Sequence, residues 1–282
     1  MKVASIDIGS NSFLLCVMEI KRGNWEIILE KANIVKIGEL FERKEGYEEK
    51  ILEKAKQTLK NYLLTCKKYN VKKILPFGTQ FFRENKNNFK ILENFEKILR
   101  TKIKILSEFE EGKYAYIGVV FPLYEKLLNR KILLFDIGGR STEIILGEGL
   151  KIIKVKSFKT GFLREKNDKI TKSTFQINGI HNFFGIGGTV VNLAKLKYKI
   201  RTFDFKKIEG KILTFADIKE LIKKINSKEI DGIEKGREDT IIKGANIVLE
   251  IMEEFNFSSF QVSTRGARHG IIFEKFLVKR EE

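Results

Sequence analysis

The chain has 282 residues, and its composition, with 43% hydrophobic and 32% charged residues, excludes an intrinsically disordered or collagen-like protein. Its 54 Lys and Arg against 37 Asp and Glu give a formal net charge of +17, which favours a polyanionic partner such as nucleic acid, acidic lipid or a phosphate-rich substrate. This length predicts one large domain or two domains of medium size.

Cysteine usage and hydropathy indicate a cytoplasmic protein. Cys16 and Cys66 are the only cysteines, which excludes a disulfide framework or a cysteine-built zinc site and favours a reducing compartment. Asp7 lies where a signal peptide keeps an apolar run, so we expect no leader. The longest uncharged stretch, residues 173–194, is too polar to cross a bilayer.

Apolar, β-branched runs alternate with amphipathic stretches along the chain. In the first half they predict strands at residues 3–6, 13–17, 25–29, 34–37, 73–77 and 103–106, and helices at 48–69 and 89–99. In the second half they predict strands at 132–135, 144–146 and 260–263, and helices at 190–197, 216–225, 240–255 and 268–279. Such alternation predicts an α/β fold with mainly buried sheets.

A short motif occurs twice, about half a chain apart. Residues 7–12 read DIGSNS and residues 136–141 read DIGGRS, and each copy lies between two apolar, β-branched runs. This arrangement predicts a strand, a glycine-containing turn and a second strand in each copy. The repeat therefore predicts two similar domains.

Pro122 marks the expected boundary between these domains. Proline ends the helix that precedes it and is a candidate hinge. We expect domain I at residues 1–122, with a C-terminal helix at about 268–282 packing back on it, and domain II at residues 123–267.

Three turns rich in glycine and hydroxyl side chains are candidate phosphate sites. Glycine lets backbone N–H groups approach a phosphate closely, and hydroxyl groups add donors. The third turn, at residues 185–189, precedes a predicted helix, whose N-terminus attracts anions. One such turn alone fits an ordinary hairpin better, but three in one chain favour phosphate binding. The candidate ligands are Gly9, Ser10, Asn11, Ser12, Gly138, Gly139, Arg140, Ser141, Thr142, Gly187, Gly188 and Thr189.

Two aspartates are candidate metal ligands. Asp7 and Asp136 each end a predicted strand and lead into a glycine turn. Hard carboxylate oxygens at this position suit Mg²⁺ held through water beside phosphates. His181 and His269, the only histidines, have no metal-ligand spacing, so neither is predicted to bind a metal ion.

The adjacent glutamates Glu110 and Glu111 are expected to have different roles. Ser107 and Glu110 fit a capping box, in which Glu110 reaches back to the start of the helix, so we interpret Glu110 as structural. Glu111 shares a helix face with Ala115 and Gly118, and these small residues allow another element to approach closely.

Further short motifs are spread along the chain. They are Gly78-Thr79 with Arg83 and Asn87, Glu110-Glu111-Gly112, Arg237 with Asp239, Gly244-Ala245, Ser263, Gly266 and Arg268-His269-Gly270. With the three glycine turns, they resemble the motifs of the Ppx/GppA family of exopolyphosphatases and guanosine pentaphosphate phosphohydrolases, within the actin, Hsp70 and sugar-kinase superfamily. They occur in family order over nearly the whole chain, and the length resembles that of the short, two-domain members.

The resemblance implies two ribonuclease-H-like (actin-like ATPase) domains with an active site in the interdomain cleft. It implies a hydrolase in which Mg²⁺, or Mn²⁺, assists attack of water on the terminal phosphoanhydride of inorganic polyphosphate or guanosine pentaphosphate. That substrate is the expected partner; we expect no specific nucleic acid, no membrane, and a monomer or homodimer.

The resemblance also assigns residues. The family's motif glutamates fall on Glu111, as the base or water-positioning residue, and on Glu143, near the metal and the water. Glu143 lies in an apolar strand, where a carboxylate needs a partner or a metal ion. Thr79 and Arg83 join the candidate phosphate ligands. The candidate metal ligands are Asp7, Asp136 and Glu143.

Four positions depart from the family pattern. Arg140 and Glu108 stand where glycine is usual, Phe13-Leu14 where an arginine is usual, and His269 where a glutamate is usual. The Arg140 guanidinium either forks onto phosphate oxygens or points into solvent at a hairpin tip. The departures motivate a non-enzymatic alternative, a degenerate polyphosphate or nucleotide sensor. A superfamily kinase or ATPase is the other alternative.

Overall fold

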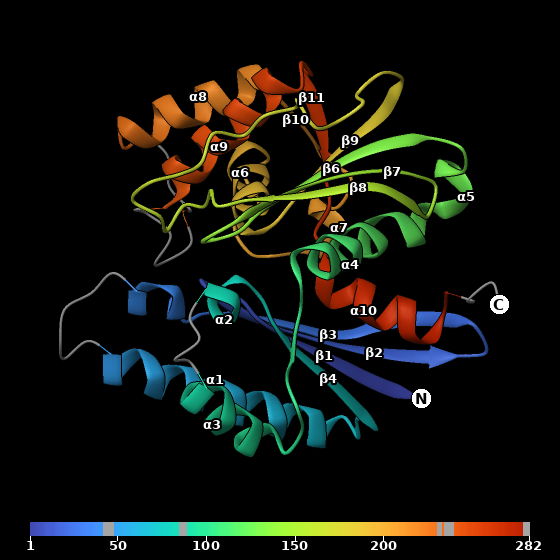
Figure 1. Ribbon diagram of the computed structural model, residues 1–282, viewed down its shortest axis with the longest axis vertical. Helices are drawn as coiled ribbons and strands as arrows, with labels where there is room; N and C mark the ends of the chain where they lie inside the picture. Colours follow the sequence, from blue (N-terminus) through green and yellow to red (C-terminus); the bar gives the residue numbers. More distant parts are fainter. Residues whose placement is uncertain (42–47, 85–88, 230–232, 234–239, 279–282) are drawn as a thin grey trace. The chain divides into compact units, whose positions relative to one another are not determined.

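The computed structural model describes residues 1–41, 48–84, 89–229, 233 and 240–278. The motif residues Asn87, Arg237 and Asp239 lie outside these described residues. Contacts between residues divide the chain into two compact units, Met1–Gly118 with Ala267–Glu282, and Val119–Gly266. Each unit contains one β-sheet with helices packed against it (Figure 1).

The described part of the first unit contains a five-stranded sheet of order β3-β2-β1-β4-β5. Its strands are β1 (Lys2–Ile8), β2 (Ser12–Lys21), β3 (Asn24–Ile34), β4 (Lys73–Gly78) and β5 (Lys104–Ile105). β1, β2 and β3 pair antiparallel, whereas β4 is parallel to β1 and to β5. The predicted strands at 3–6, 13–17, 25–29, 73–77 and 103–106 all fall on this sheet.

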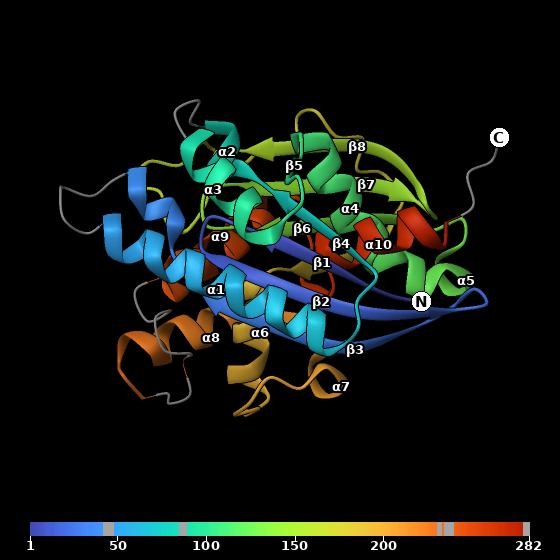
Figure 2. The same cartoon turned by 90° about the horizontal axis from the view of Figure 1, so that it is seen from below.

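Helices cover both faces of the first sheet. They are the 3-10 helix η1 (Ile37–Phe41), α1 (Glu48–Lys68), α2 (Gln80–Glu84), α3 (Phe89–Leu99), α4 (Glu108–Val120) and α10 (Ala267–Phe276). Apolar residues of α1 recur every three or four positions, at Ile51, Ala55, Leu59 and Tyr62, and pack on the sheet with α3. Figure 2 looks onto this face, with α1 and α3 in front of the strands. α10 contacts β1 and β2 from the opposite face (Figure 1).

The predicted strand at residues 34–37 is wrong. Ile34 ends β3, Lys36 has a φ of +63°, and Ile37 begins η1. The left-handed backbone at Lys36 turns the chain out of the sheet. The amides of Val35 and Lys36 donate instead to the Asn11 carbonyl, at 2.9 and 2.8 Å. This segment therefore supports the first glycine turn.

The described part of the second unit contains a six-stranded sheet of order β10-β11-β9-β6-β7-β8. Its strands are β6 (Lys131–Ile137), β7 (Thr142–Glu148), β8 (Lys151–Phe158), β9 (Ile180–Ile186), β10 (Ile212–Thr214) and β11 (Ser259–Val262). β6, β7 and β8 pair antiparallel, and β9 is parallel to β6 and β11. Apart from β10, this order and these directions repeat the first sheet, so the predicted two-copy α/β architecture is confirmed.

Most helices of the second unit pack on one face of its sheet (Figure 1), whereas residues 123–127 lie beside Phe184 of the other face. The helices are the 3-10 helix η3 (Phe121–Leu123), α5 (Tyr124–Leu127), α6 (Gly188–Lys197), α7 (Phe205–Ile208), α8 (Phe215–Asn226) and α9 (Ile241–Glu254). α6, α8 and α9 bury apolar side chains with Leu133, Phe135 and Ile137 of β6. Nowhere in the described ranges is a helix both long and apolar enough to span a membrane.

Candidate active site

The two copies of the repeated motif form the same turn. The Gly9 amide donates to the Ser12 carbonyl at 3.2 Å, and the Gly138 amide donates to the Ser141 carbonyl at 2.9 Å. A Cβ on either glycine would lie 3.0 Å from the carbonyl oxygen that accepts this bond. Glycine is therefore required at both positions by the close return of the chain.

Neighbouring backbone holds the first turn in place. Besides the two bonds to the Asn11 carbonyl, the Ser10 carbonyl accepts from the Gly38 amide at 2.7 Å. The Asn11 side-chain Nδ2 donates to the Ser12 hydroxyl at 3.2 Å. Ser10 and Asn11 are each only 6% exposed, whereas Ser12 is half-buried. The turn is thus a fixed element, which suits binding through oriented donors.

The second turn is held by the loop that follows β8. The Gly139 carbonyl accepts from the Leu163 amide at 2.7 Å, and the Arg140 carbonyl accepts from the Arg164 Nε at 2.5 Å. The Arg140 side chain is buried, with the residue 7% exposed, so the interpretation that it points into solvent is wrong. Thr142 is fully buried, and its hydroxyl donates to the Thr160 carbonyl at 2.8 Å, which supports the turn from inside.

Asp136 and Glu143 are direct neighbours at the end of the hairpin. They oppose each other in the register of β6 and β7, which places their Cβ atoms about 5 Å apart on one face of the sheet. Glu143 is 2% exposed and accepts from the Ser157 hydroxyl at 2.8 Å. A buried carboxylate beside a second carboxylate needs a compensating positive charge.

The third turn closes on Asp136. Gly187 has a φ of +93°, and a Cβ there would lie 2.8 Å from Asp136 Oδ1. Gly187 is also the N-cap of α6 and provides no side-chain cap, so the first amides of this helix are left for other acceptors. Thr189 is 2% exposed and packs against Gly244 of α9, so its side chain anchors the helix.

The first unit has the aspartate but not the second carboxylate. Asp7 of β1 opposes Leu14 of β2, at the register position where the second unit pairs Asp136 with Glu143. Two adjacent carboxylates beside glycine turns form the donor set that Mg²⁺ prefers when water completes its shell. The residues of the second unit therefore fit this ion, and Asp7 offers one further carboxylate in the first unit.

Glu111 is held by an arginine. Arg83 Nη1 lies 2.6 Å from Glu111 Oε2, and Gln80 Oε1 accepts from Arg83 Nε and Nη2 at 3.0 and 2.6 Å. Arg83 Nη1 also donates to the Leu106 carbonyl at 2.8 Å. Burial raises the pKa of Glu111, and the charge of Arg83 opposes this effect. Thr79, 6% exposed, directly precedes the helix that carries Arg83.

Glu110 has the structural role predicted for it. The Ser107 amide donates to Glu110 Oε2 at 3.0 Å, and the Glu110 amide donates to the Ser107 hydroxyl at 3.2 Å, which confirms the capping box. Glu110 also pairs with Lys104 at 2.5 Å. The predicted close approach occurs farther along α4, where a Cβ on Gly270 of α10 would lie 2.9 Å from the Gly118 amide nitrogen.

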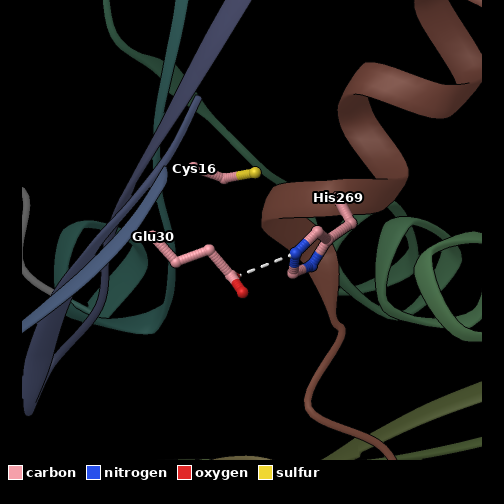
Figure 3. Close-up of side chains that lie close together, drawn as sticks. All are labelled: Cys16, Glu30 and His269. Atoms are coloured by element: carbon pink, nitrogen blue, oxygen red, sulfur yellow. Dashed lines mark ion pairs between the residues drawn. The ribbon is translucent and has the colours of Figure 1, made fainter. Parts of the chain in front are cut away.

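A buried cluster that was not predicted from the sequence lies between β2, β3 and α10 (Figure 3). Cys16 and Glu30 face each other across the two strands, and His269 Nε2 lies 3.0 Å from Glu30 Oε1. In the described part of the chain, this is the one group of three or more His, Cys, Asp or Glu side chains whose ligand atoms lie within 4.8 Å of one another. Arg268 Nε and Nη2 already donate to the same Glu30 oxygen, at 3.0 and 2.6 Å. The cluster is therefore an ion-pair network that attaches α10 to the sheet.

In this network the negative charge of Glu30 is compensated by its neighbours Arg268 and His269. Burial opposes ionisation of Glu30, but Arg268 and His269 outweigh it and hold the pKa of the carboxyl well below its usual range. Burial raises the pKa of the Cys16 thiol far above its usual value, so Cys16 stays protonated. The nearest signal in the sequence was the histidine at 269, where the family pattern has a glutamate.

Two sheets of one topology, each with an aspartate and a glycine turn at the end of its first strand, define a two-domain actin-like protein. Comparison with known proteins identifies the family. The Ppx/GppA phosphatase family matches residues 16–279, and the chain belongs to this family.

Three relatives match nearly the whole of this chain, but the match covers different shares of their own lengths. It is 29% identical to the bifunctional 3-dehydroquinate synthase/phosphatase of Fusobacterium nucleatum, over 96% of the chain and 46% of that protein. It is 23% identical to a putative exopolyphosphatase of Haemophilus influenzae, over 96% of the chain and 90% of that protein. For the guanosine-5'-triphosphate,3'-diphosphate pyrophosphatase of Aliivibrio fischeri strain MJ11, the identity is 24% over 96% of the chain and 58% of that protein. The chain thus spans about half the length of two of these three relatives.

Solved structures agree with the fold. A crystal structure of the Aquifex aeolicus Ppx/GppA family member superposes with a TM-score of 0.78 and 28% identity, covering 100% of this chain and 99% of that chain. An exopolyphosphatase of Cytophaga hutchinsonii gives a TM-score of 0.83 at 18% identity, over 98% and 97% of the two chains, and at this identity shows the fold alone. The predicted family and the actin-like α/β fold are confirmed.

Proposed function

We propose that this protein hydrolyses the terminal phosphoanhydride of inorganic polyphosphate, of guanosine pentaphosphate, or of both, with Mg²⁺ as the assisting ion. The observation that carries the proposal is the Asp136 and Glu143 pair, which lies beside two glycine turns in the second unit. The names of the Haemophilus influenzae and Aliivibrio fischeri relatives support both substrate classes.

The residues of the second unit are suited to hold the phosphates. The turns at residues 138–141 and 187–188 offer backbone donors, and the start of α6 adds the favourable end of a helix dipole. Asp136 and Glu143 would hold Mg²⁺, or Mn²⁺, in the second unit, and Asp7 is the candidate metal ligand of the first unit. Bound there, the ion neutralises charge on the phosphate oxygens.

Glu111 is suited to accept the proton of the attacking water. A Glu111 carboxylate oxygen takes the proton, the water oxygen forms the new bond to phosphorus, and the bridging oxygen leaves with the shortened chain. Burial raises the pKa of this carboxyl and makes the carboxylate a stronger base than an exposed glutamate, while Arg83 partly opposes the rise and orients the group. Thr79 and Arg83 are the proposed phosphate ligands of this unit, along with the turn at residues 9–12.

Charge and compartment refine the proposal. The net charge of +17 favours a long polyanion over a compact nucleotide. Both cysteines are free and buried, which fits our proposal that the protein acts in the cytoplasm.

The test is phosphate release from polyphosphate, guanosine pentaphosphate and ATP, each with and without Mg²⁺. We expect release from the first or second substrate only when the ion is present, and loss of release in Asp136→Asn. Lys154→Gln, a change on the exposed strand β8, is the control and should keep wild-type activity. Tight binding of polyphosphate without any release would instead support the sensor alternative, and preferential use of ATP the kinase or ATPase alternative.

A further inference from the structure

A pocket of about 510 Å³ lies in the second unit, away from its two glycine turns. Its lining includes Arg130, next to the start of β6, and His181, next to the start of β9. The turns at residues 138–141 and 187–189 follow the other ends of the same two strands. Because a strand rises about 3.3 Å per residue, these seven-residue strands place Arg130 and His181 about 20 Å from the turns, and Phe184, in the middle of β9, about 10 Å from the turn that follows it.

The polar part of the lining is two cations, Lys126 and Arg130, with His181 and the side-chain amides of Asn182 and Gln261. Lys126 and Arg130 are exposed, and neither side chain has an ion-pair or hydrogen-bond partner in the described part of the chain. The backbone amide of Lys131 donates to His181 Nδ1 at 3.1 Å, which leaves the hydrogen of the neutral ring on Nε2. None of the described residues that line the pocket is acidic.

The floor of the pocket is apolar. Leu127 and Phe184 are 5% and 2% exposed, and Phe184 lies in the middle of β9. A floor of this kind attracts an apolar or aromatic group, whereas the cations attract an anion. The volume lies within the usual range of about 300–1,000 Å³ for pockets that bind small organic ligands.

We infer that this pocket binds an organic phosphate, a phosphate monoester that carries an apolar or aromatic body, of which a nucleoside monophosphate is the simplest case. Arg130 and Lys126 contact the phosphate, the His181 Nε2–H adds a neutral donor, and the body lies on Leu127 and Phe184. A bare polyphosphate has no group for this floor, so the ligand class differs from the polyphosphate proposed for the glycine turns.

The test is isothermal titration calorimetry of the full chain with AMP, adenosine and inorganic phosphate. AMP should bind at least about tenfold more tightly than either of the other two, since each of them retains only half of the contacts. The double substitution Lys126→Gln and Arg130→Gln should weaken AMP binding at least about tenfold, since both phosphate contacts lose their charge. It should leave phosphate release from polyphosphate at the wild-type level, because the pocket is separate from the glycine turns.

Lys154→Gln with Lys172→Gln is the matched control, since it removes the same charge from exposed positions of the same unit. We expect this control to bind AMP as the wild type does. The proposal is overturned if AMP affinity is unchanged in the pocket variant, if the control loses as much affinity, or if inorganic phosphate binds as tightly as AMP.

Discussion

Burial and the charge of Arg83 shift the pKa of Glu111 in opposite directions. Burial favours the neutral carboxylic acid, and the guanidinium 2.6 Å away favours the carboxylate. The pKa of Glu111 remains above its ordinary value of 4.5, because burial is the larger effect. A carboxylate with a raised pKa is a better proton acceptor than an exposed glutamate, and it is ionised once the pH is above that pKa.

Arg83→Gln should move the acid limb of the pH profile to higher pH. The proposed base works only when ionised, so kcat/KM falls as the pH falls through the pKa of Glu111 in the free enzyme. Loss of the guanidinium removes the effect that lowers this pKa, and the fall therefore begins at a higher pH. The measurement is kcat/KM for polyphosphate across pH. Lys104→Gln, which removes the partner of Glu110, should leave the limb in place; an unmoved limb in Arg83→Gln contradicts this role.

Arg140→Gly should change substrate preference. The Arg140 side chain is buried in a turn proposed to bind phosphate, and a guanidinium can form two parallel hydrogen bonds to phosphate oxygens, which glycine cannot. We expect polyphosphate binding to weaken by about 1–3 kcal/mol, the usual scale for hydrogen bonds to charged groups. Use of guanosine pentaphosphate relative to polyphosphate should rise. Unchanged ratios of kcat/KM for the two substrates would refute a selective role.

Contacts between residues close in the sequence could be predicted, and contacts between residues far apart in the sequence could not. The Ser107 and Glu110 capping box was predicted because its two partners are three residues apart on one helix turn. The Glu30 and Arg268 pair was missed because its partners are 238 residues apart, and only the tertiary fold brings them together. The Arg83 and Glu111 pair shows the same limit, since the family motif pointed to both residues but not to their contact.

At the scale of elements, α10 depends on a small number of tight contacts with the first sheet. The Ser5 hydroxyl donates to the Arg268 carbonyl at 2.5 Å, and Arg268 is paired with Glu30. A Cβ on Gly270 would overlap the Tyr114 carbonyl of α4, so glycine is required where the two helices cross. These contacts explain why a motif at the end of the chain is part of the first unit.

Glu30→Gln should destabilise the protein by about 3–5 kcal/mol, because it leaves the buried Arg268 without its counter-charge. Glu26→Gln is the matched control on the same strand, and its exposed carboxylate should cost little. The measurement is the free energy of unfolding from urea titration at neutral pH. Equal stability of the two variants would contradict the network.

The stability that the Glu30 and Arg268 pair contributes depends on pH. The folded pKa of Glu30 is lowered, so its stabilisation is present above the ordinary carboxyl pKa of 4.5 and is lost as the pH falls toward the folded value. Wild type and Glu30→Gln should therefore converge in stability as the pH is lowered below 4.5.

Elements with clear periodicity were predicted well, and elements without it were not. The helix expected at residues 89–99 coincides with α3, whose apolar residues share one face. β8 was missed because the adjacent Ile152 and Ile153 interrupt its alternation of Lys with apolar residues. β9 was missed because it carries His, Asn and Gly in a short apolar run. β10 has only three residues and depends on pairing with β11.

At the scale of the whole molecule, the repeated motif predicted the architecture correctly. Both sheets place an antiparallel three-stranded ribbon beside parallel strands, and both put the Asp and glycine turn after the first strand. The copies differ seven residues after the aspartate, where the first has Leu14 and the second has Glu143. The register places both residues opposite the aspartate of their own unit.

The net charge of +17 predicts a salt-dependent affinity for polyphosphate. Neutralising many phosphates releases counterions, so the logarithm of the association constant should fall linearly and steeply with the logarithm of salt concentration. The measurement is the dissociation constant of a long polyphosphate over a salt series without Mg²⁺. A flat response would show that the charge has no part in binding this substrate.

The central claim, water attack assisted by Glu111, is tested most directly by phosphate release from polyphosphate in Glu111→Gln. The amide preserves the shape of the side chain but cannot accept the proton, so we expect turnover to fall by about 100-fold or more while polyphosphate still binds. Glu110→Gln should keep near wild-type turnover, because Glu110 caps the helix and pairs with Lys104. Wild-type turnover in Glu111→Gln would contradict the account and would move the role of base to another carboxylate.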